Sequence, residues 1–94
     1  MEWQVYMQRK VARDVETLPD LVKQRMRSLV VELQELGTVR HTWKNFGKIR
    51  GTDDIYHCHI KKGHPTYVAC WVVKNKTIKI IEVFYVGSHE KAPY

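Results

Sequence analysis

Residues 55–86 read IYHCHIKKGHPTYVACWVVKNKTIKIIEVFYV, and this stretch decides the fold. Three runs in it are rich in β-branched and aromatic residues, as strands are, and they cover 55–61, 66–73 and 77–86. The connecting segments 62–65 and 74–76 are short and turn-like. Because short turns join antiparallel neighbours, the pattern predicts a three-stranded antiparallel meander.

Alternation within the first run assigns its two faces. Tyr56, Cys58 and Ile60 share one face, while His57 and His59 share the other. We expect the apolar set to face the core. The two histidines then point out of the open face of the sheet, at the mouth of the basic turn that follows.

Two helices are expected upstream of the strands. Apolar residues recur with helical spacing through 11–18 and again through 22–36, where Gly37 supplies the expected stop. The members of the second stripe are Val22, Met26, Leu29, Leu33 and Leu36. Thr17 is expected to be the N-cap of the second helix, with Asp20 at its third position.

The order of elements defines the fold class. Residues 3–7 alternate in a way that fits a first strand, and 38–54 are expected to be a long functional loop with room for a short strand within 43–49. A bulge near Ile81 is needed for the last run to keep its apolar residues together. We predict an α+β fold in the order β-α-α-β-β-β, with two N-terminal helices on one face of a small, mainly antiparallel sheet of three or four strands.

Length and composition exclude several protein classes. A chain of 94 residues and 11.2 kDa has room for one domain, spanning 1–94. It shows no apolar stretch of membrane-spanning length and no signal-peptide core, so we expect a cytoplasmic protein without membrane contact. Cys58 and Cys70 lie within strand-like runs and are expected to be reduced core thiols.

The positive charge is unevenly distributed along the chain. The net charge is +6, yet acidic and basic side chains balance within 1–37, so the excess lies beyond residue 37. All 5 histidines also lie there. A basic, histidine-bearing half suits a polyanion such as nucleic acid, although a solubilising surface would have the same composition.

His57 and His59 are candidates for chemistry. Their spacing occurs in metal sites, and His64 and His89 are available to complete a set, but nothing in the sequence makes the ligands converge, so no metal or other cofactor is expected. Two further interpretations remain. The histidines are either polar strand residues facing water, or proton-transfer groups that work near neutral pH.

Several short segments, taken together, resemble one family. They are the helix start at 18–19, the helix end at 33–36, the Ile-Arg-Gly at 49–51, the strand at 56–60 and the Gly-Ser-His at 87–89. In this order they are similar to the RelE/ParE superfamily of bacterial and archaeal toxins, especially its RelE-like and YafQ-like ribonuclease branch. The resemblance covers most of the chain.

This resemblance implies a toxin of a type II toxin-antitoxin system that cleaves messenger RNA on the ribosome, stops translation and is held inactive by an antitoxin, with which it forms a hetero-oligomer. Metal-independent cleavage needs a base for the 2′-hydroxyl, an acid for the departing 5′-oxygen and cations for the phosphate. By resemblance, His59 and His89 are the acid/base pair and His57 is a second choice. The expected phosphate contacts are Lys48, Arg50, Lys61 and Lys62, and Tyr94 is expected to stack on or orient a base.

The chain departs from the family pattern at three places. Thr66 and Tyr67 stand where many relatives have an arginine, Gly63 or His64 stands where YafQ-like members have an acidic residue, and one extra residue precedes the terminal aromatic. Two alternatives therefore stay open. One is a ParE-like inhibitor of DNA gyrase, whose family generally lacks the paired histidines, and the other is an inactive RNA- or protein-binding module.

Overall fold

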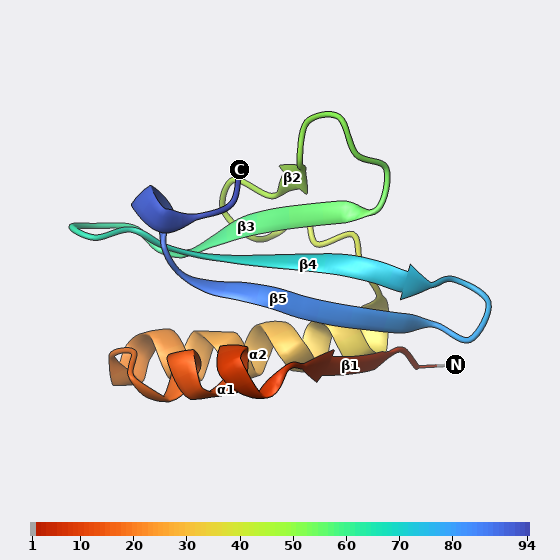
Figure 1. The fold of residues 1–94 in the computed structure, drawn as a ribbon, viewed down its shortest axis with the longest axis horizontal. Helices are drawn as coiled ribbons and strands as arrows, with labels where there is room; N and C mark the ends of the chain where they lie inside the picture. Colours follow the sequence, from red (N-terminus) through yellow and green to blue (C-terminus); the bar gives the residue numbers. More distant parts are fainter. Residues whose placement is uncertain (1) are drawn as a thin grey trace.

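In the computed structural model, which describes residues 2–94, one five-stranded sheet carries two α-helices on one face (Figure 1). The elements are β1 (Gln4–Met7), α1 (Arg9–Glu16), α2 (Asp20–Leu36), β2 (Gly47–Lys48), β3 (Ile55–Lys61), β4 (Tyr67–Asn75), β5 (Ile80–Ser88) and the 3₁₀ helix η1 (His89–Lys91). The strand order is β1-β5-β4-β3-β2, with β1 parallel to β5 and the other neighbours antiparallel. The predicted α+β class is confirmed.

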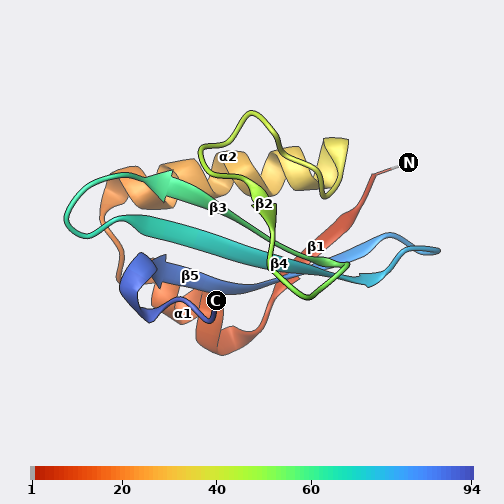
Figure 2. The same cartoon turned by 90° about the horizontal axis from the view of Figure 1, so that it is seen from above.

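The sheet has five strands instead of the three or four expected. The first strand expected within 3–7 is β1, which lies beside β5. The fifth strand is β2, whose two residues pair with His57 and Tyr56 of β3 inside the part of the long loop where a short strand was expected to fit. In Figure 2, α2 runs along the sheet beside β3, and α1 lies beside β5.

The predicted helical stripe of α2 forms the centre of the core as far as Leu33, whereas Leu36, which was expected to belong to it, is exposed at the end of the helix. Val22, Leu29 and Leu33 have no exposed surface, and they pack with the strand residues of the same face, Trp71 among them. α1 lies against β5, whereas α2 contacts β1 and β3. None of the helices in residues 2–94 has the length and apolar content needed to cross a bilayer.

The helix ends differ from the expectation at one place. Thr17 was expected to cap α2, which is wrong: it ends α1, where its Oγ1 donates a hydrogen bond of 2.7 Å to the carbonyl of Asp14. Pro19 precedes α2, and Asp20 is the first helical residue. Proline disfavours helical backbone in the residue before it, so the new helix begins only after Pro19. Gly37 ends α2 as predicted, with φ of 90°.

A bulge in β5 keeps one face of this strand apolar. The pairing with β4 slips by one residue between Val83 and Tyr85, so Phe84 is the extra residue. The bulge was expected near Ile81 and lies three positions further along; a second slip in the same ladder falls beside Ile81, between Val73 and Asn75 of β4. Because an extra residue reverses the alternation, both Val83 and Val86 reach the core.

We expect Leu29→Ala to lower the free energy of unfolding by about 2–5 kcal/mol, because it removes a fully buried side chain and leaves a cavity. The matched control is Leu36→Ala on the same helix, where the leucine is 64% exposed and the cost should stay within about 0.5 kcal/mol. Urea denaturation of both variants measures the difference. Equal losses would contradict the assignment of the α2 stripe to the core.

Candidate active site

Strand β3 presents its histidines on the face opposite the helices. Tyr56, Cys58 and Ile60 are buried against the core, while His57 and His59 are half-buried on the open face. The predicted division of the strand into an apolar and a histidine face is therefore confirmed. The reason is the period of two: once the apolar residues contact α2, the side chains between them must point away from it.

The C-terminal segment folds back across this open face (Figure 1). The N–H of His89 donates a hydrogen bond of 2.8 Å to the carbonyl of Thr66, and the Tyr85 hydroxyl donates one of 2.7 Å to the carbonyl of Ser88. These bonds fix the direction in which the chain leaves β5. As a result, η1 and the residues after it lie over β4 and β3.

Four side chains that the sequence singled out meet on this face. The rings of His59 and His89 lie 5.4 Å apart between centroids and at 68° to each other. Tyr94 stacks on His57 with centroids 4.3 Å apart, and it meets the edge of His89 at 5.9 Å. All four of the expected catalytic residues thus form one cluster, although they come from β3 and from the last six residues of the chain.

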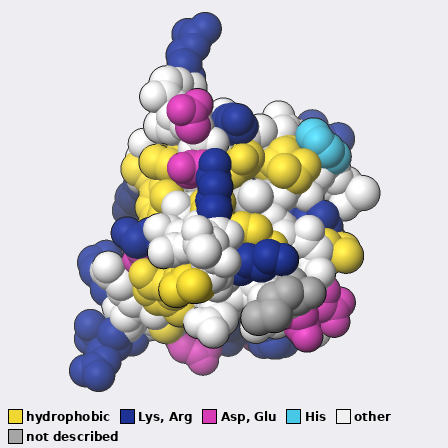
Figure 3. Space-filling model, turned by 90° about the vertical axis from the view of Figure 1, so that its right-hand side faces the viewer, with side chains coloured by type: hydrophobic (Ala, Val, Ile, Leu, Met, Phe, Trp, Pro, Cys, Tyr) yellow, Lys and Arg dark blue, Asp and Glu magenta, His cyan; other side chains and the backbone are white. Residues whose placement is uncertain are grey.

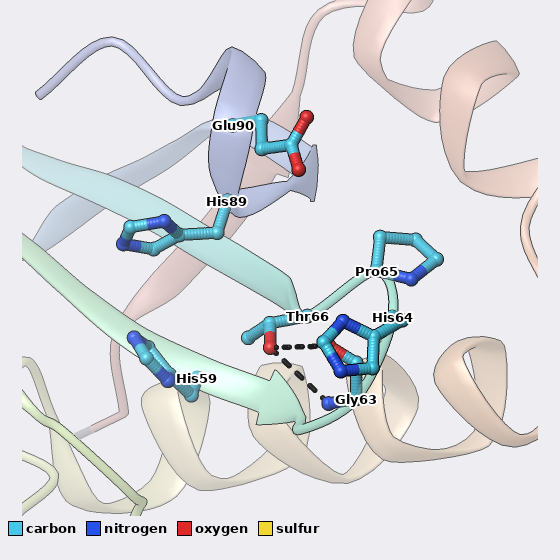
Figure 4. A pocket seen from close by; sticks show the side chains of 7 residues that line it. All are labelled: His59, Gly63, His64, Pro65, Thr66, His89 and Glu90. Carbon is cyan, nitrogen blue, oxygen red and sulfur yellow. Dashed lines mark hydrogen bonds between the residues drawn. The ribbon is translucent and has the colours of Figure 1, made fainter.

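His59 and His89 lie next to each other on one side of an open cleft of about 600 Å³ (Figure 4). The cleft is lined by His59, Gly63, His64, Pro65, Thr66, His89 and Glu90. Its far wall is the turn between β3 and β4, which the Thr66 hydroxyl closes by accepting from the N–H of Gly63 at 3.1 Å and donating to its carbonyl at 3.0 Å. The cleft is therefore bounded by segments fixed through hydrogen bonds.

The surroundings lower the pKa of two of the histidines. Burial, followed by the neighbouring His59 and His89, lowers the pKa of His57 below its usual value. Burial also lowers the pKa of His59, with further contributions from His89, Lys44 and Lys62. Both imidazoles are consequently neutral near pH 7. Burial raises the pKa of Tyr94 to about 12, so its hydroxyl keeps its proton.

The expected phosphate-binding residues are dispersed. Lys62 lies close enough to His59 for its charge to act on the imidazole. The Lys61 ammonium lies beside Gly63, since a Cβ atom added to this glycine would be 3.5 Å from Lys61 Nζ. Lys48 pairs with Tyr56 and so lies on the helix side of the sheet. Arg50 is exposed in the segment after β2.

Lys44 is a residue that the sequence reasoning missed. Its carbonyl accepts a hydrogen bond of 2.7 Å from the N–H of His59, and its charge helps to lower the pKa of that histidine. Its only signal in the sequence was a basic residue within a loop expected to be functional. The pairing of this loop with β3 was not visible, because it depends on where the edge of the sheet ends.

Charge alone does not mark the site. The end of the molecule that carries the β4–β5 turn also shows Lys and Arg side chains, but there they lie among acidic and apolar ones (Figure 3). Lys76 pairs with Asp54 at 3.2 Å and Lys74 with Glu82 at 3.6 Å. The lysines at 44, 61 and 62 have no acidic partner at ion-pair distance among residues 2–94.

The side chains of the cluster suit proton transfer. Residues 2–94 contain no group of three or more His, Cys, Asp or Glu side chains placed to hold a metal ion. What the cleft offers is a pair of imidazoles, each able to accept or give a proton, beside unpaired ammonium groups that can stabilise negative charge.

Solved structures share this architecture. The RelE-RelB complex from the archaeon Pyrococcus horikoshii OT3 contains a chain that matches with a TM-score of 0.76 and 20% identity, over 98% of this chain and 100% of that one. The chain has the RelE fold. A double mutant of E. coli toxin RelE in the free state matches at a TM-score of 0.74 with 18% identity, over 98% of this chain and 88% of the other.

The intact E. coli RelBE toxin-antitoxin complex matches at a TM-score of 0.71 with 19% identity, over 95% of this chain and 99% of the other. No model of a protein family matches the sequence, and no curated protein does. The RelE fold is therefore retained at a level of identity where little of the surface chemistry needs to be shared.

We expect the protein to lose stability as the pH falls from 7.5 to 5. The folded state lowers the pKa of His57 and His59, so the unfolded state binds more protons below about pH 6.5. Stability from these groups is complete above that pH and lost as the pH drops through the lowered values. Thermal unfolding of His57→Gln and His59→Gln should show a weaker pH dependence than the parent; an unchanged slope in both would contradict the burial argument.

Proposed function

We propose that this protein is the toxin of a type II toxin-antitoxin system and acts as a ribosome-dependent endoribonuclease on messenger RNA. The RelE fold supports the first part of the proposal. The observation that carries the second part is the pairing of His59 with His89, whose rings lie 5.4 Å apart on one side of an open cleft. A gyrase inhibitor or an inactive binding module of this fold would have no need for such a pair.

The cluster supplies the groups that RNA cleavage requires. His59 is neutral near pH 7 and acts as the base that takes the proton of a 2′-hydroxyl. The 2′-oxygen then bonds to the adjacent phosphorus while the bond from phosphorus to the 5′-oxygen breaks. His89 is the general acid that gives that oxygen a proton. The products are a 2′,3′-cyclic phosphate and a 5′-hydroxyl end.

The other predicted residues have supporting roles. Tyr94 keeps its proton, and its ring stacks on His57, so it can orient that imidazole or present a surface to a base. Lys61 and Lys62, which lie at the cleft turn, contact the phosphate, and the exposed Arg50 contacts RNA farther along the backbone. Lys48, which lies on the helix side of the sheet, has no place among these contacts.

The proposal also defines the partners and the place of action. Ribosomes carry the message, so the protein acts in the cytoplasm as one toxin domain spanning 1–94. Two of the similar structures are complexes of RelE with RelB. By that likeness, an antitoxin with an acidic or amphipathic segment binds this chain in a hetero-oligomer and blocks its activity.

His59→Gln and His89→Gln should each reduce cleavage of ribosome-bound messages by roughly 10²–10⁴-fold, the usual contribution of one general acid or base. Glutamine retains size and hydrogen bonding but does not titrate. Primer extension on translated messages measures the breaks, and His41→Gln, outside the cluster, is the matched control. Wild-type cleavage by both site variants would refute the assignment.

Expression without a partner should arrest growth by stopping protein synthesis. Pulse labelling of protein and of DNA distinguishes this outcome from gyrase inhibition, which would stop replication first. The control is co-expression with the product of the neighbouring gene, which should co-purify with the toxin and restore growth. Cleavage of naked RNA at the same rate as ribosome-bound RNA would contradict ribosome dependence.

A further inference from the structure

The segment before β2 is fastened to helix α2 by one carboxylate. Oε1 of Glu32 accepts a hydrogen bond of 2.8 Å from the indole N–H of Trp43 and pairs with the Arg40 guanidinium at 3.3 Å. The side chains of Arg40 and Glu32 are 15% and 33% exposed, so this pair is partly shielded from water. The backbone N–H of Trp43 donates a separate hydrogen bond of 3.0 Å to the carbonyl of Arg40, which closes the turn between these two residues.

A second anchor lies on the other side of Lys44. Phe46 stacks on Tyr56 with centroids 5.6 Å apart and on Trp71 at 6.0 Å. Between the two anchors, Asn45 has a φ of 55°, in the left-handed region, which turns the chain sharply. Lys44 is therefore held between Trp43 and a tight turn, while its own side chain remains exposed.

The position of Lys44 beside the cluster follows from this anchoring. Its carbonyl accepts a hydrogen bond from the N–H of His59, although Lys44 lies before the start of the two-residue strand β2. The groups whose charges act on His59 come from three sides: His89 from η1, Lys44 from this loop and Lys62 from the β3–β4 turn. Lys44 has no acidic partner among residues 2–94, so its ammonium is available to an anion.

We propose that Lys44 binds a phosphate of the RNA backbone next to His59, and that Glu32 is the positioning residue that holds Lys44 there. The inference rests on the proposed function, because it assigns a phosphodiester as the ligand. Glu32 contacts no substrate. It acts through Trp43 and Arg40, which fix the loop on which Lys44 is carried.

Glu32 could act on His59 directly through its charge or indirectly by positioning the loop, and these two roles predict opposite changes in the pKa of His59 when Glu32 is replaced. Removal of a carboxylate charge by itself makes protonation of a nearby histidine less favourable and lowers its pKa. Release of the loop moves the Lys44 ammonium away from His59 and raises the pKa. The sign of the change in Glu32→Ala therefore separates positioning from a simple charge effect.

The test is a proton NMR titration of the His59 imidazole, identified by its absence in His59→Gln. Lys44→Gln and Glu32→Ala should both raise the pKa of His59 toward its usual value, and Glu32→Gln, which can still accept from Trp43, should give a smaller rise. The controls are Lys10→Gln on α1 and Glu35→Ala on α2, both exposed, which should give no rise. A fall in Glu32→Ala, or no change in Lys44→Gln, overturns the inference.

Cleavage of ribosome-bound messages provides the second readout. Lys44→Gln should lower kcat/KM by about 10- to 100-fold, the size of one hydrogen bond to a charged group, while Lys10→Gln should retain the parent value. An unchanged kcat/KM for Lys44→Gln overturns the phosphate contact. If the unsubstituted protein fails to cleave, the proposed function fails, whereas the titration still decides whether Glu32 positions Lys44.

Discussion

The hydrogen bond from the N–H of His89 to the carbonyl of Thr66 fixes the direction in which the chain leaves its last strand, and the site depends on that direction. A tail continuing along β5 would carry His89 and Tyr94 away from β3. Because the chain turns into η1, the tail covers the open face and meets the histidines of a strand some thirty positions earlier. One backbone hydrogen bond thus brings together the two parts of the histidine cluster, one on β3 and the other in the C-terminal tail.

The same closure sets the electrostatics of the cluster. Covering the sheet buries the imidazoles of His57 and His59, and burial is the largest cause of their lowered pKa. The lysines around the cleft act in the same direction on His59 and lack acidic partners among residues 2–94, whereas Lys74 and Lys76 are paired. A neutral base beside uncompensated cations is the arrangement that suits a phosphodiester substrate.

Local departures from regular structure place the residues of the candidate site. The bulge at Phe84 keeps the face of β5 toward the helices apolar through Val86, so the chain reaches Ser88 in the phase that allows the tail to turn over the other face. At the opposite edge of the sheet, Asn45 has left-handed backbone geometry and turns the chain next to Lys44. Both are positions where regular secondary structure would have placed the neighbouring side chains elsewhere.

The sequence by itself determined the elements whose signals are local. Helical spacing from Val22 to Leu33 and the period of two in β3 reflect burial on one side, which fixes both the element and the inward face. The order of strands and helices, together with the resemblance to RelE-like toxins, then indicated the fold that the structure shows.

Only the tertiary structure decided what depends on distant partners. Helix α2 begins after Pro19 and not at Thr17, because Thr17 binds back to Asp14. The pairing of Gly47 with His57 makes a strand that two residues cannot signal, and it brings Lys44 to His59 while leaving Lys48 on the other face. These outcomes depend on contacts between residues far apart along the chain, and no periodicity within a short stretch records them.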